Sequence, residues 1–250
     1  MKQTIDILGV PIHQVTMDEA VGLIDQFVSS STLHTVFTPN PEIIMLARQD
    51  ERLCTILNQA DLVVPDGIGV VIASKFQKGM KLKQRVAGYD LVQNTMKQAV
   101  NRFSANTGYK YYFLGSKPGV AEKAAEEMRK TYPGIQIVGT HDGYFKQENI
   151  PKIIDDINDS MANIVLVALG APKQELWIEE YKGLLKHVRV AIGVGGSLDV
   201  MAGVAKRAPL IYQKLGLEWF YRLVKEPTRI KRMLVLPQFL LEVIFKTGRS

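Results

Sequence analysis

The sequence predicts an α/β fold, with a largely parallel sheet flanked by helices and a helical appendage at the C-terminus. Three observations lead to this prediction. Short β-branched runs alternate with helical stretches over residues 1–205. Each expected strand is followed by a loop rich in glycine, proline and polar residues. Basic, aromatic and apolar residues are concentrated after Ala205.

The expected elements follow one another in a regular order. Thr16 and Glu19 have the spacing of a capping box, so a helix is expected from there to about Val28, and Pro41 suits the first turn of another. The other expected helices span 120–132, 150–161 and 174–185, and the expected strands span 34–38, 61–64, 111–114, 136–139, 164–169 and 188–194. This alternation is close to a doubly wound, Rossmann-like unit.

Length and composition support a folded core. The chain has 250 residues, of which 46% are hydrophobic and 22% charged, which excludes disorder as the main state. The first residues lack an apolar signal region, and no run of about 18 apolar residues occurs, so we expect a protein that is neither secreted nor membrane-spanning. Cys54 is the single cysteine, which suits a reducing cytoplasm.

The positive charge belongs to the C-terminal segment. Ten Lys or Arg and three Glu from Lys206 to Ser250 give it +7, which leaves −1 of the total +6 for residues 1–205. We therefore expect two parts, a core over 1–205 and a basic, amphipathic, membrane-associating tail over 206–250. A near-neutral body argues against a nucleic-acid partner. Docking of the tail on the body and a homo-oligomer are the alternatives.

The expected tail helices span 210–225, 228–236 and 239–245, separated by prolines. Arg222, Arg229 and Arg232 are seven and three residues apart, so they share one face if helical geometry continues through the break. We expect these arginines to contact an anionic lipid or a diphosphate.

Ligands of doubly wound sheets bind outside the carboxyl ends of the strands, so the loops at these ends are the candidate binding elements. Their glycines let backbone N–H groups approach a phosphate, although ordinary turns need glycine and proline too. From these loops we expect Asp142, Gly195 and Gly196 to contact a nucleotide-type ligand.

Asp66 is the candidate catalytic residue. It follows an apolar strand and stands between Pro65 and Gly67, where a carboxylate is held with little freedom. Such a group can act as the general base when a sugar hydroxyl attacks an anomeric carbon. The alternative is an Asp that only forms the turn.

Three further polar residues are candidates for substrate binding. Thr38 and Asn40 offer a hydroxyl and an amide at the end of a neighbouring strand, with helix capping as the alternative role. Arg85 follows a basic segment and could neutralise a diphosphate leaving group, or lie on the surface.

Several other classes of site lack support. The chain has no Walker A motif and no G-x-G-x-x-G after its first strand, which disfavours ATP hydrolysis and ordinary NAD binding. No D-x-D element is present, and the four histidines stand far apart without metal-ligand spacing. We therefore expect no metal and no cofactor.

Seven strings, in order and spacing, resemble the WecG/TagA/CpsF glycosyltransferase family. They cover nearly the whole chain and comprise Thr38–Glu42, Pro65–Val70, Arg85–Asp90, Phe113–Gly115, Gly170–Glu175, Gly193–Gly196 and Lys206–Pro209, followed by the region from Gly216 to Arg229. The resemblance implies a metal-independent, inverting transferase that acts on undecaprenyl-diphosphate-linked N-acetylglucosamine at the inner face of the plasma membrane.

The sequence is most similar to the TagA branch of that family. That similarity implies a UDP-sugar-dependent hexosyltransferase that uses UDP-N-acetylmannosamine and builds the linkage unit of wall teichoic acid. It also implies that Asp66 is the base, that Thr38, Asn40, Arg85 and Gln174 line the pocket, and that the three tail arginines complete the active site at the membrane.

Other functions remain as alternatives. Donors in the family differ between branches, so UDP-N-acetylmannosamine uronic acid and UDP-glucose are alternative donors. A UDP-sugar epimerase or dehydrogenase would need bound nicotinamide. A non-catalytic nucleotide-sugar-binding membrane scaffold would keep its function when the Asp66 carboxylate becomes an amide.

Overall fold

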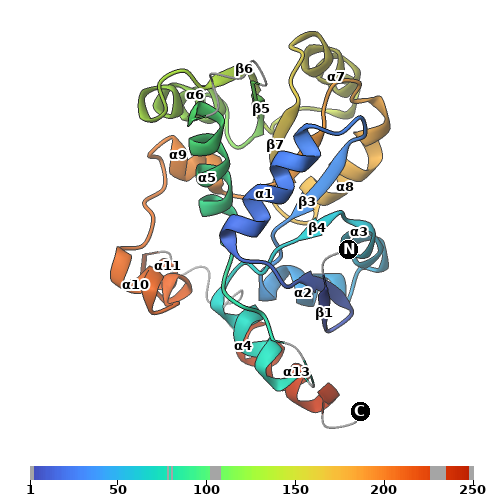
Figure 1. The fold of residues 1–250 in the computed structure, drawn as a ribbon, viewed down its shortest axis with the longest axis vertical. Coiled ribbons are helices and arrows are strands. Elements are labelled where there is room, and N and C mark those ends of the chain that lie inside the picture. Colours follow the sequence, from blue (N-terminus) through green and yellow to red (C-terminus); the bar gives the residue numbers. More distant parts are fainter. Residues whose placement is uncertain (1–2, 78, 80, 102–107, 226–234, 248–250) are drawn as a thin grey trace.

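The computed structural model describes residues 3–77, 79, 81–101, 108–225 and 235–247. Its centre is a six-stranded sheet in the order β4-β3-β8-β7-β5-β6, and every pair of neighbouring strands is parallel (Figure 1). The strands are β3 (His34–Phe37), β4 (Leu62–Val63), β5 (Lys110–Gly115), β6 (Gln136–His141), β7 (Ile164–Ala168) and β8 (Val190–Gly193). The predicted α/β fold is confirmed.

The central strands are apolar because both faces of the sheet are covered. Every residue of β7 and β8 is buried, as expected of parallel strands with helices on either side. One buried cluster includes residues of α2, α3, α4, α7 and α8, and the other includes residues of α1, α5, α6 and α9. These helices are α1 (Met17–Val28), α2 (Pro41–Ala47), α3 (Glu51–Gln59), α4 (Ile68–Phe76), α5 (Gly88–Asn101), α6 (Val120–Thr131), α7 (Ile150–Asp159), α8 (Lys173–Tyr181) and α9 (Ser197–Met201).

Local signals explain the boundaries of several helices. The capping box at α1 is present as predicted, because Thr16 accepts a hydrogen bond from the Glu19 backbone and the Glu19 side chain accepts one from the Thr16 backbone. Pro41 occupies the first turn of α2. The predicted helix over 174–185 is shorter, because α8 ends at Tyr181 and a 3₁₀ turn covers Lys182–Leu184.

An antiparallel hairpin precedes the sheet and was not predicted. Its strands are β1 (Thr4–Ile7) and β2 (Val10–His13), joined at Leu8 and Gly9, both of which have positive φ. The backbone N–H of Val63 donates to Nδ1 of His13 at 3.0 Å, so the hairpin is tied to the edge strand β4. The hairpin therefore packs beside the loop that carries Asp66.

The C-terminal segment forms α10 (Leu210–Lys214), α11 (Glu218–Lys225) and α13 (Val235–Thr247). The prediction of one helix over 210–225 is wrong, because the chain breaks at Gly216, which has a φ of 72°. The predicted helix over 228–236 lies largely outside the described residues.

Helix α13 packs on α2 and α4, as Figure 1 shows at the lower end of the molecule. It buries Phe239 and Val243 in the same cluster as the hairpin. Glu242 pairs with Arg48, and Lys246 pairs with Asp6 at 3.2 Å. Part of the tail therefore docks on the body. Within the described ranges, no helix has both the length and the apolar character needed to cross a bilayer.

Candidate active site

The loops at the carboxyl ends of β3, β4 and β8 converge on one part of the sheet edge. β8 lies beside β3, and β4 lies on the other side of β3, although β8 comes more than 100 residues later in the chain. Thr38 after β3, Asp66 after β4 and Gly193 at the end of β8 are thus neighbours. This convergence makes the edge near β4, β3 and β8 the candidate active site.

Asp66 is half-buried between β4 and α4. Gly67 caps α4 with a φ of 91°, a conformation that favours glycine and turns the chain sharply after Asp66. The backbone N–H of Val86 donates to the carbonyl oxygen of Pro65 at 2.9 Å, and the N–H of Gly88 donates to Oδ2 of Asp66 at 3.4 Å. The carboxylate is therefore fixed at the start of α5.

Thr38 and Asn40 lie next to this carboxylate. The Thr38 hydroxyl donates to the carbonyl oxygen of Gly193 at 3.4 Å, and a Cβ built on Gly88 would lie 2.8 Å from the Thr38 Oγ1. Asn40 caps α2, because its Oδ1 accepts from the N–H of Ile43 at 3.0 Å. The alternative role of Asn40 as a cap is thus present, and its Cβ lies 3.8 Å from a Cβ built on Gly67.

Gln174 links two loops of the site from below the surface. It is 2% exposed, its Oε1 accepts from the N–H of Gly195 at 2.9 Å, and its Nε2 donates to Oε1 of Glu175 at 2.8 Å. Both polar ends of the amide are therefore engaged within the protein. The geometry gives Gln174 the role of holding the Gly195 loop in place.

Glu175 is a buried carboxyl group that the sequence analysis did not single out. It is 1% exposed, and its burial raises the pKa of the carboxyl above its usual value, while the hydrogen bond from Gln174 lowers that pKa by less. The burial of Glu175 depends on the packing of α8 against β8. The hydrophobic periodicity of the sequence therefore did not predict this burial.

The backbone of the loop at Gly195 faces open space. Gly195 has a φ of 51°, and a Cβ built there would meet no atom within 4 Å. Gly196 caps the short helix α9. These features leave room for a ligand beside the loop.

Asp142 is a predicted site residue, among those that the structure describes, that lies far from Asp66. It follows β6, the edge strand opposite to β4. Its Oδ1 accepts from the N–H of Tyr144 at 2.7 Å, which closes a local turn. At about 4.8 Å between strands, five strand spacings separate the two aspartates by about 24 Å.

A short series of polar contacts runs from the Asp142 loop toward Gly196. The N–H of Gly143 donates to the carbonyl oxygen of Ser116 at 2.8 Å, and the Ser116 hydroxyl donates to Asp199 at 3.1 Å. The Asp199 Oδ2 lies 3.9 Å from a Cβ built on Gly196. The Asp142 loop therefore borders the far side of the same sheet edge.

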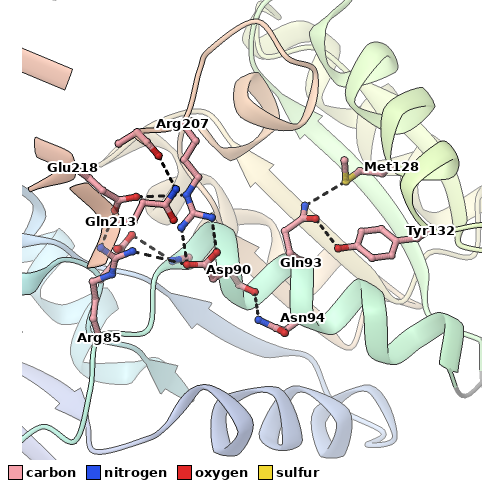
Figure 2. Close-up of polar contacts among 12 residues, drawn as sticks. Arg85, Asp90, Gln93, Asn94, Met128, Tyr132, Arg207, Gln213 and Glu218 are labelled. Atoms are coloured by element: carbon pink, nitrogen blue, oxygen red, sulfur yellow. Dashed lines mark hydrogen bonds and ion pairs between the residues drawn. The ribbon is translucent and has the colours of Figure 1, made fainter. Parts of the chain in front are cut away.

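Arg85 is not a free surface residue. Figure 2 shows its guanidinium directed toward Glu218 of α11. Nη1 of Arg85 and Oε2 of Glu218 are 2.8 Å apart, and the Arg85 side chain is 16% exposed. The sequence analysis missed three partners in this region, namely Asp90, Arg207 and Glu218. The family-like strings contain all three, but no local pattern pairs residues so far apart in the chain.

The tail arginines are only partly covered by the structure. Arg222 lies in α11. Arg229 and Arg232 lie outside the described residues. Their expected contact with substrate or membrane stays a prediction. Among the residues that the structure describes, no three His, Cys, Asp or Glu side chains gather as metal ligands would.

Known proteins resemble this chain over most of its length. The model of the glycosyl transferase WecG/TagA/CpsF family matches residues 5–250. A protein of Bacillus spizizenii (strain ATCC 23059 / NRRL B-14472 / W23) is 39% identical over 84% of this chain and 78% of its own. Proteins of Bacillus subtilis (strain 168) and Staphylococcus aureus (strain MRSA252) are 34% and 35% identical, over 97% and 96% of this chain and 91% of their own.

All three relatives are named N-acetylglucosaminyldiphosphoundecaprenol N-acetyl-beta-D-mannosaminyltransferase. The family model covers nearly the whole length of the chain, and it includes every strand end described above. The chain therefore belongs to the glycosyl transferase WecG/TagA/CpsF family.

Proposed function

We propose that this protein transfers N-acetylmannosamine from UDP-N-acetylmannosamine to undecaprenyl-diphosphate-linked N-acetylglucosamine, with inversion at the anomeric carbon. The observation that carries the proposal is the Asp66 carboxylate, fixed by Gly88 beside Thr38 and Asn40 at the carboxyl edge of a parallel sheet. The names of the relatives supply the acceptor and the sugar.

In this reaction Asp66 removes the proton from the attacking hydroxyl of the acceptor. The hydroxyl oxygen bonds to the anomeric carbon from the face opposite UDP, the bond from that carbon to the diphosphate breaks, and UDP leaves with the electron pair. Arg85, three residues before the Gly88 whose N–H donates to Asp66, is the candidate that stabilises the leaving diphosphate.

The test is UDP release from UDP-N-acetylmannosamine in the presence of a synthetic lipid-diphosphate N-acetylglucosamine acceptor. Loss of the base should lower kcat of Asp66→Asn by about 10²- to 10⁴-fold. Asp155→Asn changes an exposed carboxylate on α7 and serves as the matched control. A rate for Asp66→Asn within a few fold of the control would remove Asp66 from the mechanism.

The donor needs its own comparison. UDP-N-acetylmannosamine, UDP-N-acetylmannosamine uronic acid and UDP-glucose are offered to the same acceptor in parallel. We expect turnover only with the first. Turnover with either of the others would replace the proposed donor, and binding without turnover for all three would favour the non-catalytic scaffold.

We propose further that the tail contacts an anionic membrane surface on the cytoplasmic side. Large apolar side chains are exposed on α10 and α11, at the same end of the molecule as α4 and α13 in Figure 1; they are Leu210, Ile211, Leu215, Trp219, Phe220 and Val224. Exposed apolar residues on a segment with a charge of +7 are typical of interfacial helices. A lipid-linked acceptor lies at that surface, which would bring the enzyme to its substrate.

A further inference from the structure

Four charged side chains join the start of α5 to the tail, and we call them the latch cluster: Arg85, Asp90, Arg207 and Glu218. They come from three segments, since Arg85 and Asp90 flank the first residue of α5, Arg207 precedes α10, and Glu218 begins α11. Figure 2 shows both guanidinium groups converging on the two carboxylates.

The contacts within the latch cluster are unequal. Arg207 holds Asp90 through both of its terminal nitrogens, at 2.6 and 2.7 Å, and its guanidinium carbon lies 4.8 Å from the centre of the Tyr89 ring. Partial burial lowers the pKa of Arg207, but its bonds to Asp90 and Glu218 outweigh this effect and raise that pKa. Arg207 and Asp90 therefore form the stronger ion pair of the cluster.

The contacts of Glu218 are weaker than this pair. It lies 2.8 Å from Arg85 but 3.4 Å from the Nε of Arg207, and Arg85 is 3.8 Å from Asp90. The short contact of Arg85 with a carboxylate is thus the one to Glu218. The side chains of Arg85 and Arg207 are 16% and 22% exposed, so each keeps a small exposed surface while it is paired.

The latch cluster borders the candidate active site on two sides. The segment from Arg85 to Asp90 contains Gly88, whose N–H donates to Asp66 at 3.4 Å. From the tail, a Cβ built on Gly216 would lie 2.8 Å from the Cβ of Ile68, two residues after Asp66. A charge placed between the two arginines would therefore lie near the proposed base.

We infer that Arg85 and Arg207 form a binding site for a diphosphate group and that the Glu218 carboxylate competes with the diphosphate for it. A carboxylate that bridges two guanidinium groups uses the same donors that two phosphate oxygens would use. A diphosphate carries more charge than one carboxylate, so it can displace Glu218 from a partly exposed pair. This inference rests on the proposed function, because the donor and the acceptor both carry a diphosphate.

Displacement of Glu218 would act on the tail directly. Glu218 is the first residue of α11, and its ion pair with Arg85 ties this helix to the body, while its pair with Arg207 joins it to the start of the tail. When a diphosphate takes these donors, α11 loses its tie to Arg85. Occupancy of the site and the position of α11 are therefore coupled, and each ligand can shift this equilibrium only by its preference for one position.

Calorimetric titration with inorganic diphosphate tests the inference without sugar donor or acceptor, so its outcome is separate from that of the transfer assay. Glu218→Gln removes the competing charge and should bind diphosphate about tenfold more tightly, whereas Arg207→Gln should bind about tenfold more weakly. Glu180→Gln, which removes the exposed partner of Arg52 at 3.3 Å, is the matched control and should bind as the unchanged protein does. Equal or weaker binding by Glu218→Gln would overturn the inference.

A second measurement uses the unchanged sequence and does not depend on the folding of a Glu218 variant. Trp219 follows Glu218 in α11, and Trp177 is the other tryptophan of the chain. Diphosphate should change the fluorescence of the protein and leave that of Trp219→Phe unchanged. Binding without any contribution from Trp219 would contradict the displacement. Titration with UDP and with a short prenyl diphosphate then distinguishes the donor from the acceptor as the source of the anion.

Discussion

At the scale of single residues, the site combines side chains that face a ligand with side chains that only hold loops. Asp66, Thr38 and Asn40 were predicted from their positions after strands, and the fold places them together. Gln174 was predicted to line the pocket, but both ends of its amide are used inside the protein. The burial of Gln174 depends on the placement of β8 beside β7. The sequence around residue 174 alone does not predict that placement.

Glu175 provides a prediction about pH. Burial raises the pKa of its carboxyl above the ordinary value of 4.5. Below pH 4.5 the group is protonated in both the folded and the unfolded protein. As the pH rises, the unfolded state loses this proton first, so the free energy of unfolding falls until the pH passes the folded pKa. The loss amounts to about 1.4 kcal/mol for each unit between the two pKa values.

Glu175→Gln should abolish this fall, because the amide resembles the protonated carboxyl and does not titrate. Urea unfolding between pH 4 and pH 8 compares the two proteins, and the variant should gain relative stability as the pH rises. Glu148→Gln, at a carboxylate whose side chain is 73% exposed, should show no such gain. A stability difference for Glu175→Gln that does not vary with pH would mean that the carboxyl is already ionised in the folded protein.

At the scale of secondary structure, local patterns predicted most strands and the helices near residues 16–28, 120–131 and 150–159. Helix α5 was not predicted, although Leu91, Val92, Thr95 and Met96 recur at helical spacing and are buried. The hairpin was missed because its strands are four residues long and its Leu-Gly turn is a weak signal. The break between α10 and α11 falls at Gly216, whose φ of 72° ends α10, and the turn lies against Ile68 of α4.

Gly216→Ala tests that contact. A Cβ at Gly216 would lie 2.8 Å from the Cβ of Ile68, and the backbone has a φ of 72°. The left-handed conformation costs about 1–2 kcal/mol for alanine, and overpacking adds about 1–3 kcal/mol. Gly203→Ala is the matched control, because Gly203 has a φ of 69° and a Cβ there meets no atom within 4 Å.

The free energy of unfolding in urea should therefore fall further for Gly216→Ala than for Gly203→Ala. The difference between the two variants isolates the packing of the α10–α11 turn on α4. If both variants lose the same stability, the turn does not rest on Ile68 in solution. Transfer activity should also fall for Gly216→Ala alone, because Ile68 lies two residues after the proposed base.

At the scale of the whole molecule, the sequence predicted the class of fold but could not predict the order of strands. That order is set by pairing between distant segments, and it separates Asp142 from Asp66 while bringing Gly193 to Thr38. The division of charge between the body and the tail could be predicted from the composition. The docking of α13 on α2 and α4 was one of the alternatives. Among the described residues of the tail, exposed apolar side chains remain on α10 and α11 and also on α13, at Leu241, Ile244 and Phe245.

This division predicts how the protein should bind membranes. Ile211 and Leu215 are each 64% exposed on α10 and just after it, so their replacement by glutamate should not disturb the core. Inserted into a lipid surface, each would contribute on the order of 1 kcal/mol, and the added negative charges would repel anionic lipid. Ile211→Glu/Leu215→Glu should therefore bind vesicles containing phosphatidylglycerol at least about tenfold more weakly in a flotation assay.

Leu184→Glu is the matched control, because Leu184 is 55% exposed in the 3₁₀ turn after α8, outside the tail. It should bind vesicles as the unchanged protein does, and binding of both should weaken as salt rises, since the tail carries +7. If the control loses as much binding as the double variant, the contact is a general hydrophobic one and the tail has no special role. If only the double variant loses binding, the α10–α11 region is the surface that meets the membrane, and it does so beside the loop that carries Asp66.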